Sequence, residues 1–100
     1  MHNNPAIGIL GAGAWGTTIA KLLSDKNSDV LLWAKETQVK KGVEKTRINE
    51  IYLDKIKLNK SLKITNHLED LSELDILFIV VPTQYIQSTL RPLKKIIKKN

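Results

Sequence analysis

The distribution of apolar and polar residues at the start of the chain predicts a strand, a helix and a second strand. Ala6–Leu10 and Val30–Ala34 are short apolar runs of strand length, typical of parallel strands buried on both faces. Between them, residues 14–24 carry apolar side chains at helical spacing. The expected stripe is Trp15, Ile19, Leu22 and Leu23, and the smaller face beside it, suited to close contact with a sheet, is Gly16, Ala20 and Leu23. A strand, helix and strand in this order predict a right-handed βαβ unit.

The remaining pattern predicts further alternating elements. We expect a helix over residues 36–50, interrupted at Gly42, a loop over 53–61, a strand over 62–65, and a helical turn from an Asn66 cap to Leu71. Residues 75–81 predict another buried strand, ended by Pro82, before a last helix from Thr83 or Gln84 that Pro92 kinks or restarts. The predicted fold class is α/β, a partial Rossmann-type doubly wound parallel sheet forming one domain over residues 1–100.

A glycine motif lies where the first strand meets the first helix. Gly11-x-Gly13-x-x-Gly16 occurs in the strand, turn and helix setting that a dinucleotide site requires. Gly11 would form the tight turn, Gly13 would let a pyrophosphate approach the backbone, and Gly16 would let the helix pack on the strand. The helix N-terminus would offer free N–H groups to the phosphates. The alternative is a glycine-rich turn in another kind of α/β protein.

Two further positions bear on the cofactor. In this fold the residues at the end of the second strand usually determine whether NAD or NADP is preferred. In this chain Lys35 and Glu36 follow one another at that position. Lys35 favours the 2′-phosphate of NADP slightly over NAD, whereas Glu36 would repel that phosphate, and Lys35 is alternatively an ordinary solvated lysine. Pro82 follows the strand that should flank the glycine turn across the cofactor crevice, or it only ends that strand.

The amino-acid composition excludes several other classes of protein. The 100 residues carry a net charge of +6 and no cysteine, which excludes a disulfide framework and thiolate chemistry. The lysines lack interleaved aromatic side chains, so we expect solvated surface rather than a nucleic-acid site. No apolar run is long enough for a membrane span, and residues 1–5 do not form a signal peptide, which favours a cytoplasmic protein. His67, in a polar connection, is expected at the surface, and no metal site is predicted.

The chain resembles one family over essentially its whole length, bacterial NAD(P)-dependent glycerol-3-phosphate dehydrogenase. The resemblance rests on four stretches: residues 9–17 with an aromatic residue before the third glycine, residues 30–34, residues 48–58 and residues 79–83. It implies reversible reduction of dihydroxyacetone phosphate to sn-glycerol 3-phosphate for phospholipid synthesis. It also implies that Ala14 and Trp15 contact the cofactor and that Lys35 lies near the adenosine ribose. Asn27, Asp54–Lys55 and Glu36 depart from the family pattern.

The same resemblance implies that the catalytic lysine lies beyond residue 100 and that a helical substrate domain is missing, so no catalytic residue is assigned here. We therefore expect an N-terminal cofactor-binding piece: an isolated domain, a truncated gene product or one part of a split gene. The full enzyme would take a phosphorylated small molecule, and a homodimer or a separate C-terminal partner chain are both compatible with the sequence. The alternatives are a non-catalytic remnant and a cofactor module of another hydroxyacid dehydrogenase.

Overall fold

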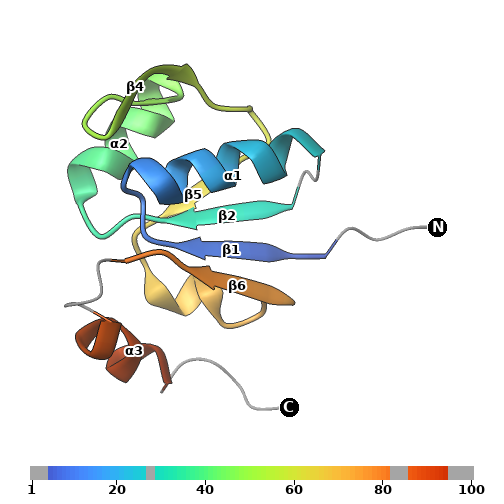
Figure 1. The fold of residues 1–100 in the computed structure, drawn as a ribbon, viewed down its shortest axis with the longest axis vertical. Coiled ribbons are helices and arrows are strands. Elements are labelled where there is room, and N and C mark those ends of the chain that lie inside the picture. The colour runs from blue at the N-terminus through green and yellow to red at the C-terminus, as the bar shows by residue number, and fades with distance from the viewer. Residues whose placement is uncertain (1–4, 27–28, 82–85, 95–100) are drawn as a thin grey trace.

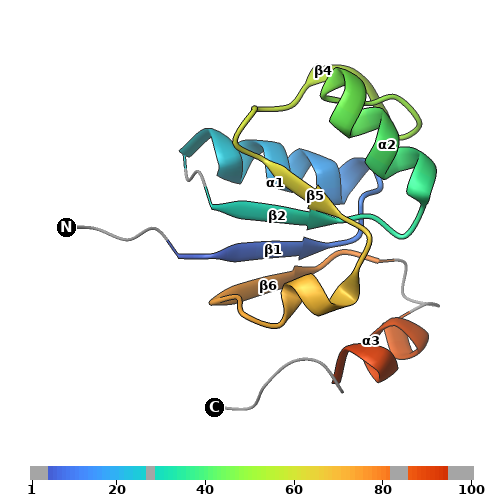
Figure 2. The ribbon, with the colours of Figure 1, turned by 180° about the vertical axis from the view of Figure 1, so that it is seen from behind.

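The centre of the molecule is a parallel sheet, in a computed structural model that describes residues 5–26, 29–81 and 86–94 (Figure 1). Its four strands lie in the order β5-β2-β1-β6, and every neighbouring pair is parallel. The bounds are β1 Ile7–Leu10, β2 Val30–Trp33, β5 Lys63–Thr65 and β6 Ile76–Ile79. The chain moves outward from β1 to β5 and then crosses to the other side of β1, so the predicted Rossmann-type sheet is confirmed (Figures 1 and 2).

The strand register brings three chain segments out at one edge. Leu10 lies opposite both Trp33 and Ile79, so β1, β2 and β6 end level with one another. Two hydrogen bonds continue the ladders past that line, from the Gly11 N–H to the Trp33 carbonyl at 3.1 Å and from the Val80 N–H to the Leu10 carbonyl at 2.8 Å. The segments that follow β1, β2 and β6 therefore leave the sheet side by side.

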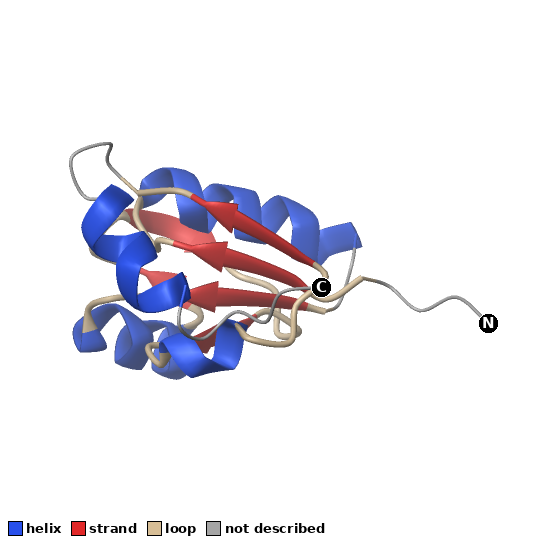
Figure 3. Cartoon of the chain, turned by 90° about the horizontal axis from the view of Figure 1, so that it is seen from below, coloured by secondary structure: helices blue, strands red, loops and turns tan. Residues whose placement is uncertain are grey.

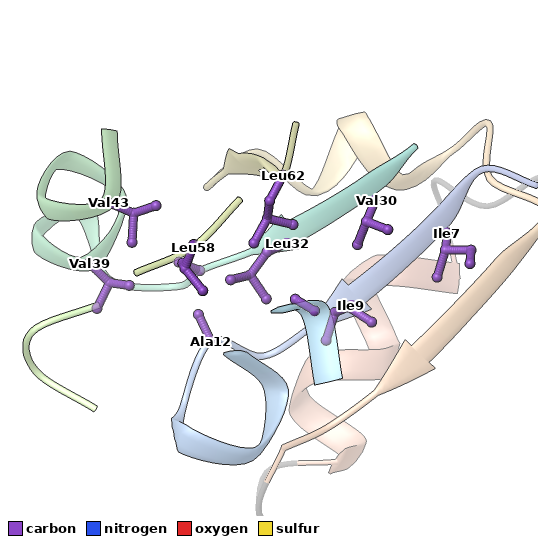
Figure 4. Close-up of a cluster of buried hydrophobic side chains, with 11 residues drawn as sticks. Ile7, Ile9, Ala12, Val30, Leu32, Val39, Val43, Leu58 and Leu62 are labelled. Carbon is purple, nitrogen blue, oxygen red and sulfur yellow. The ribbon is translucent and has the colours of Figure 1, made fainter. Parts of the chain in front are cut away.

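Helices cover both faces of the sheet, as a doubly wound fold requires (Figure 3). One buried cluster joins β1 and β2 to the helices α1 and α2, and a second joins the opposite face to η1 and α3. The bounds are α1 Ala14–Lys26, α2 Thr37–Thr46, η1 Leu68–Leu71 and α3 Ile86–Lys94. Alternate strand residues build the first cluster: Ile7, Ile9, Val30 and Leu32 meet Val39 and Val43 of α2, together with Leu58 and Leu62 (Figure 4).

The predicted apolar stripe of α1 is only partly correct. Trp15 is 76% exposed and Leu22 is 60% exposed, whereas Gly16 and Ala20 are buried against the sheet. The reason is the short distance between helix and strand: a Cβ atom on Gly16 would lie 1.7 Å from the carbonyl oxygen of Gly11. Only small side chains fit there, so the expected small-residue face packs inward. Of the predicted stripe, Ile19 and Leu23 pack against the core at its margin, whereas Trp15 and Leu22 face away.

The segment after α2 differs from the prediction. The helix keeps Gly42 inside it but ends at Thr46, because Arg47 adopts the left-handed conformation with φ of 62° and its N–H caps the helix at the Val43 carbonyl. Two short strands then pair antiparallel, β3 Ile48–Asn49 and β4 Leu53–Lys57. The helix expected over residues 36–50 and the loop expected over residues 53–61 are therefore both wrong in part.

The predicted strand over 75–81 is confirmed as β6, but three of its side chains are exposed because it lies at the edge of the described sheet: Ile76, Phe78 and Ile79. The predicted turn at 66–71 is confirmed as η1, with His67, which is exposed as expected, in the capping position in place of Asn66. Pro92 lies within α3, while the expected helix start at 83–84, the Asn27 helix stop and Pro82 fall outside the described residues.

Candidate functional site

The turn after β1 can be built only from glycine at its first position. Gly11 has a φ of +121°, a conformation that other residues rarely adopt. A Cβ atom there would lie 2.1 Å from the backbone oxygen of Val80, in the segment that follows β6. Gly11 therefore makes the tight turn expected of it and lets β6 approach β1 closely.

Gly13 and Gly16 serve different purposes. Gly16 is buried under the turn, where its missing side chain allows α1 to contact the Gly11 backbone. Gly13 has no positive φ, and a Cβ atom placed on it would meet nothing within 4 Å. Packing within the chain thus gives no reason for glycine at position 13. The open space in front of it is what a phosphate group needs in order to approach the backbone.

The first turn of α1 completes the phosphate-binding geometry. Its opening residues, Ala14 and Trp15, are exposed, and no acidic side chain lies in this turn. The first N–H groups of a helix have no partner within the helix, and the helix dipole adds partial positive charge at this end. The arrangement favours an anionic group in front of Gly13.

A cleft of about 720 Å³ lies at the carboxyl ends of the strands, where such folds bind ligands. It brings together Gly11 and Gly13 of the turn with Lys35 and with Val80 and Val81 after β6. Of the predicted site residues, Ala14 and Trp15 begin the adjoining helix, Gly16 lies beneath the turn, and Pro82 is outside the described residues. The expectation that the segment after β6 faces the glycine turn is confirmed at Val80 and Val81.

Charged and polar side chains gather where the cleft meets the end of β2. Lys35 and Glu36 are both exposed, and the Tyr52 hydroxyl donates a hydrogen bond of 2.8 Å to Glu36 Oε1. That hydrogen bond raises the pKa of the Tyr52 phenol, and desolvation and the carboxylate charge act in the same direction. Among the described residues no ion pair involves Lys35. A cation and an oriented carboxylate thus both border the cleft here.

Tyr52 also lines the cleft, although no local pattern predicts it as a site residue. The sequence pattern predicts helix up to residue 50, just before Tyr52, whereas the β3–β4 pairing places Tyr52 beside the cleft. The signal that could have corrected this is the β-branched and aromatic content of residues 48–53, which is typical of strands.

Asn49 of β3 is a second residue that residue chemistry alone did not select. Its amide is buried and donates hydrogen bonds of 2.8 Å to the Ala12 carbonyl and of 2.8 Å to Thr17 Oγ1. Ala12 lies between the first two glycines, so β3 is attached directly to the phosphate-binding turn.

The described ranges contain no group of three or more His, Cys, Asp or Glu side chains placed to hold a metal ion. None of the helices in these ranges is both long enough and apolar enough to span a bilayer.

A glycine turn at the switch point between β1 and β6 defines the nucleotide-binding class of Rossmann domains. Within that class, the sequence profile of the family described as NAD-dependent glycerol-3-phosphate dehydrogenase N-terminus matches residues 6–100. The chain belongs to this family.

Individual relatives agree with this assignment. The chain is 40% identical over 87 residues to glycerol-3-phosphate dehydrogenase (NAD(P)+) of Erythrobacter litoralis, covering 87% of this chain and 26% of the relative. The enzyme of the same name from Geobacter metallireducens is 41% identical over 93 residues, covering 92% and 28%. The crystal structure of glycerol-3-phosphate dehydrogenase from Coxiella burnetii has a TM-score of 0.89 and 30% identity, covering 96% of this chain and 30% of that one. The chain thus spans about a quarter of the length of the curated relatives.

Proposed function

We propose that this chain is the NAD(P)-binding portion of a glycerol-3-phosphate dehydrogenase. The observation that carries the proposal is the open space at Gly13, in a turn where Gly11 and Gly16 are explained by contacts within the chain and Gly13 is not. A dinucleotide pyrophosphate would occupy that space, and the N-terminus of α1 would stabilise its charge. Family membership and the sequence relatives support the same assignment.

The described residues would divide the work of binding. Gly11, Gly13 and Gly16 would shape the phosphate turn, and Ala14 and Trp15 would present the helix N-terminus. Lys35 would attract the 2′-phosphate of NADP, and the Glu36 carboxylate would accept the ribose hydroxyl of NAD. Pro82 would extend the wall that Val80 and Val81 form opposite the turn.

The nicotinamide, when bound, would supply the hydride that interconverts dihydroxyacetone phosphate and sn-glycerol 3-phosphate, a precursor for phospholipid synthesis. We assign no catalytic residue within this chain. In this proposal the phosphorylated substrate and the groups that protonate it are held by sequence outside residues 1–100, in the same polypeptide or in a partner chain. The 100 residues bind and orient the cofactor.

The test is a fluorescence titration with NADH and NADPH, because Trp33 lines the cleft and Trp15 opens the adjacent helix. We expect quenching at micromolar cofactor and loss of binding in Gly13→Val, whose side chain would fill the phosphate space. The matched control is Gly42→Ala, since a Cβ atom at Gly42 also meets nothing within 4 Å but lies on α2.

Two outcomes would contradict the proposal. One is unchanged fluorescence of the unaltered chain at millimolar cofactor, and the other is equal binding by Gly13→Val and the control. A cooperative melting transition that shifts upward with NADPH would exclude the alternative of a non-binding remnant, because only a folded binding site is stabilised by its ligand.

A further inference from the structure

The side-chain amide of Asn49 makes three hydrogen bonds, which connect the glycine turn and the start of α1 to the segment that carries Tyr52. Its exposed fraction is 1%, and its Nδ2 group donates both protons, to the Ala12 carbonyl and to Thr17 Oγ1. Its Oδ1 atom accepts the backbone N–H of Tyr52 at 3.3 Å. Tyr52 in turn holds Glu36 through its hydroxyl. One buried amide therefore joins the phosphate-binding turn to the segment that orients the carboxylate at the end of β2.

The contact with Ala12 fixes the direction of one peptide group. The Ala12 carbonyl accepts a second hydrogen bond, from Thr17 Oγ1 at 3.2 Å, so two buried donors hold it toward the interior. The Ala12–Gly13 peptide is trans, as are all the described peptide bonds. In a trans peptide the C=O and the N–H of the next residue point in opposite directions. With the carbonyl held inward, the Gly13 N–H is directed outward, away from Asn49.

We propose that Asn49 is a positioning residue for the cofactor: it holds the Ala12–Gly13 peptide so that the Gly13 N–H faces the pyrophosphate. The inference rests on the proposed function, because the pyrophosphate is the group that this N–H would bind. Preorganised N–H groups bind an anion without the cost of ordering the turn at the moment of binding. Asn49 itself does not touch the cofactor.

A structural role alone would make a different prediction. Leucine has the branched shape of asparagine but cannot donate hydrogen bonds, so Asn49→Leu removes the amide bonds while keeping a side chain in the same buried space. The direction of the Ala12 carbonyl would then depend on the longer bond from Thr17 alone. A positioning role therefore predicts a defect in binding the pyrophosphate that exceeds any loss of stability.

The experiment compares NADH with adenosine, which lacks the pyrophosphate, on the full 100-residue chain. We expect Asn49→Leu to weaken NADH binding about tenfold or more, the usual effect of losing a buried hydrogen bond to a fixed group. Adenosine affinity should fall by clearly less than NADH affinity, because adenosine meets only the ribose end, which Asn49 reaches indirectly through Tyr52. The control is Val43→Ala, a fully buried core position on α2, which should lower the melting temperature and leave the NADH affinity unchanged.

A second measurement needs no ligand. Hydrogen exchange of the Thr17 N–H, which donates to the Gly13 carbonyl at 3.0 Å, should accelerate in Asn49→Leu by more than the loss of global stability accounts for. In Val43→Ala any acceleration should match the loss of global stability. If Asn49→Leu does not fold, Thr17→Val removes the other donor to the same carbonyl and should weaken NADH binding about threefold, in keeping with its longer bond.

The outcomes separate the two proposals. A folded Asn49→Leu chain with unchanged NADH affinity, or with equal losses for NADH and adenosine, would overturn the positioning role and leave the proposed function standing. An unaltered chain that binds neither NADH nor NADPH would overturn the proposed function and the positioning role together.

Discussion

Replacing Gly16 by alanine should destabilise the chain strongly, although alanine is the better helix former. The added Cβ atom would lie 1.7 Å from the Gly11 carbonyl oxygen and 2.9 Å from its carbon. Both are backbone atoms and cannot rotate aside as a side chain could. Reaching even 3.0 Å requires a shift of 3.0 − 1.7, or 1.3 Å, in either α1 or the turn. A shift of that size separates the helix from β1 along the contact that Gly16 and Ala20 make.

The expected cost follows from two opposing effects. Overpacking of a dense interior costs about 1–3 kcal/mol and sometimes more, and a backbone-to-backbone clash belongs at or above the upper end. Alanine recovers up to about 1 kcal/mol because it loses less chain entropy than glycine in a helix. The net expectation for Gly16→Ala is a loss of about 2–3 kcal/mol. For a domain of this size that corresponds to a fall in melting temperature of roughly 10–20 °C.

Two other glycines supply the controls, because a Cβ atom on Gly13 or Gly42 meets nothing within 4 Å. Gly42→Ala, inside α2, should raise the free energy of unfolding by about 0.5–1 kcal/mol, and Gly13→Ala should change it by less than about 0.5 kcal/mol. Urea unfolding followed by circular dichroism measures all three variants. A Gly16→Ala chain that unfolds at the same urea concentration as the unaltered chain would refute the packing argument.

Three further predictions concern the side chains at the end of β2, where the cofactor ribose would bind, and the turn after α2. Lys35→Gln should weaken NADPH binding about fivefold, or ~1 kcal/mol, because it removes one cation beside the 2′-phosphate, and it should leave NADH binding nearly unchanged. Calorimetry would measure both affinities, and equal effects on the two cofactors would count against this role. The raised pKa of Tyr52 means that its hydrogen bond to Glu36 is present below pH 10 and is lost as the pH rises through the folded-state pKa. In an ultraviolet titration Glu36→Gln should lower the midpoint that Tyr52→Phe identifies, and an unmoved midpoint would exclude the bond. Arg47→Ala should destabilise the chain by about 1–3 kcal/mol, because the guanidinium donates to the Leu62 carbonyl at 2.6 Å and also to the Asn59 carbonyl. Urea unfolding would measure this loss, and a loss below about 0.5 kcal/mol would contradict the prediction.

Most of the sheet could be predicted because its strands are continuous apolar runs. The apolar runs at residues 6–10 and 30–34 are too short for helices and are therefore assigned as strands. The glycine motif between them marks where the helix that connects these strands begins. The helix stop at Arg47 could not be predicted, because a left-handed arginine carries no local signal of the kind that glycine gives. The β3–β4 pair was missed for the same reason, since the helix was expected to continue.

In the candidate site, too, some residues could be predicted from the sequence and others could not. Residues that act through the backbone, such as Gly11 and Gly16, are recognisable from their spacing because the geometry tolerates no other residue. Asn49 and Tyr52 act through contacts with segments distant in the sequence. Asn49 lies 37 positions from Ala12, and Tyr52 lies 16 positions from Glu36. No short-range pattern encodes such contacts, so only the folded chain reveals them.

The position of β1 between β2 and β6 also sets the order in which the chain can fold. The side chain of Asp75 and the backbone N–H of Ala6, which join β1 to the start of β6, are 69 positions apart. At a synthesis rate of roughly 5–20 residues per second, β1 has no partner on that side for about 3–14 seconds, while β2 and β5 can already pair on the other. Because Gly11 is held against Val80, the phosphate turn reaches its final form only when β6 arrives. Cofactor binding therefore depends on the pairing of β1 with β6, which comes latest in the sequence among the described strands.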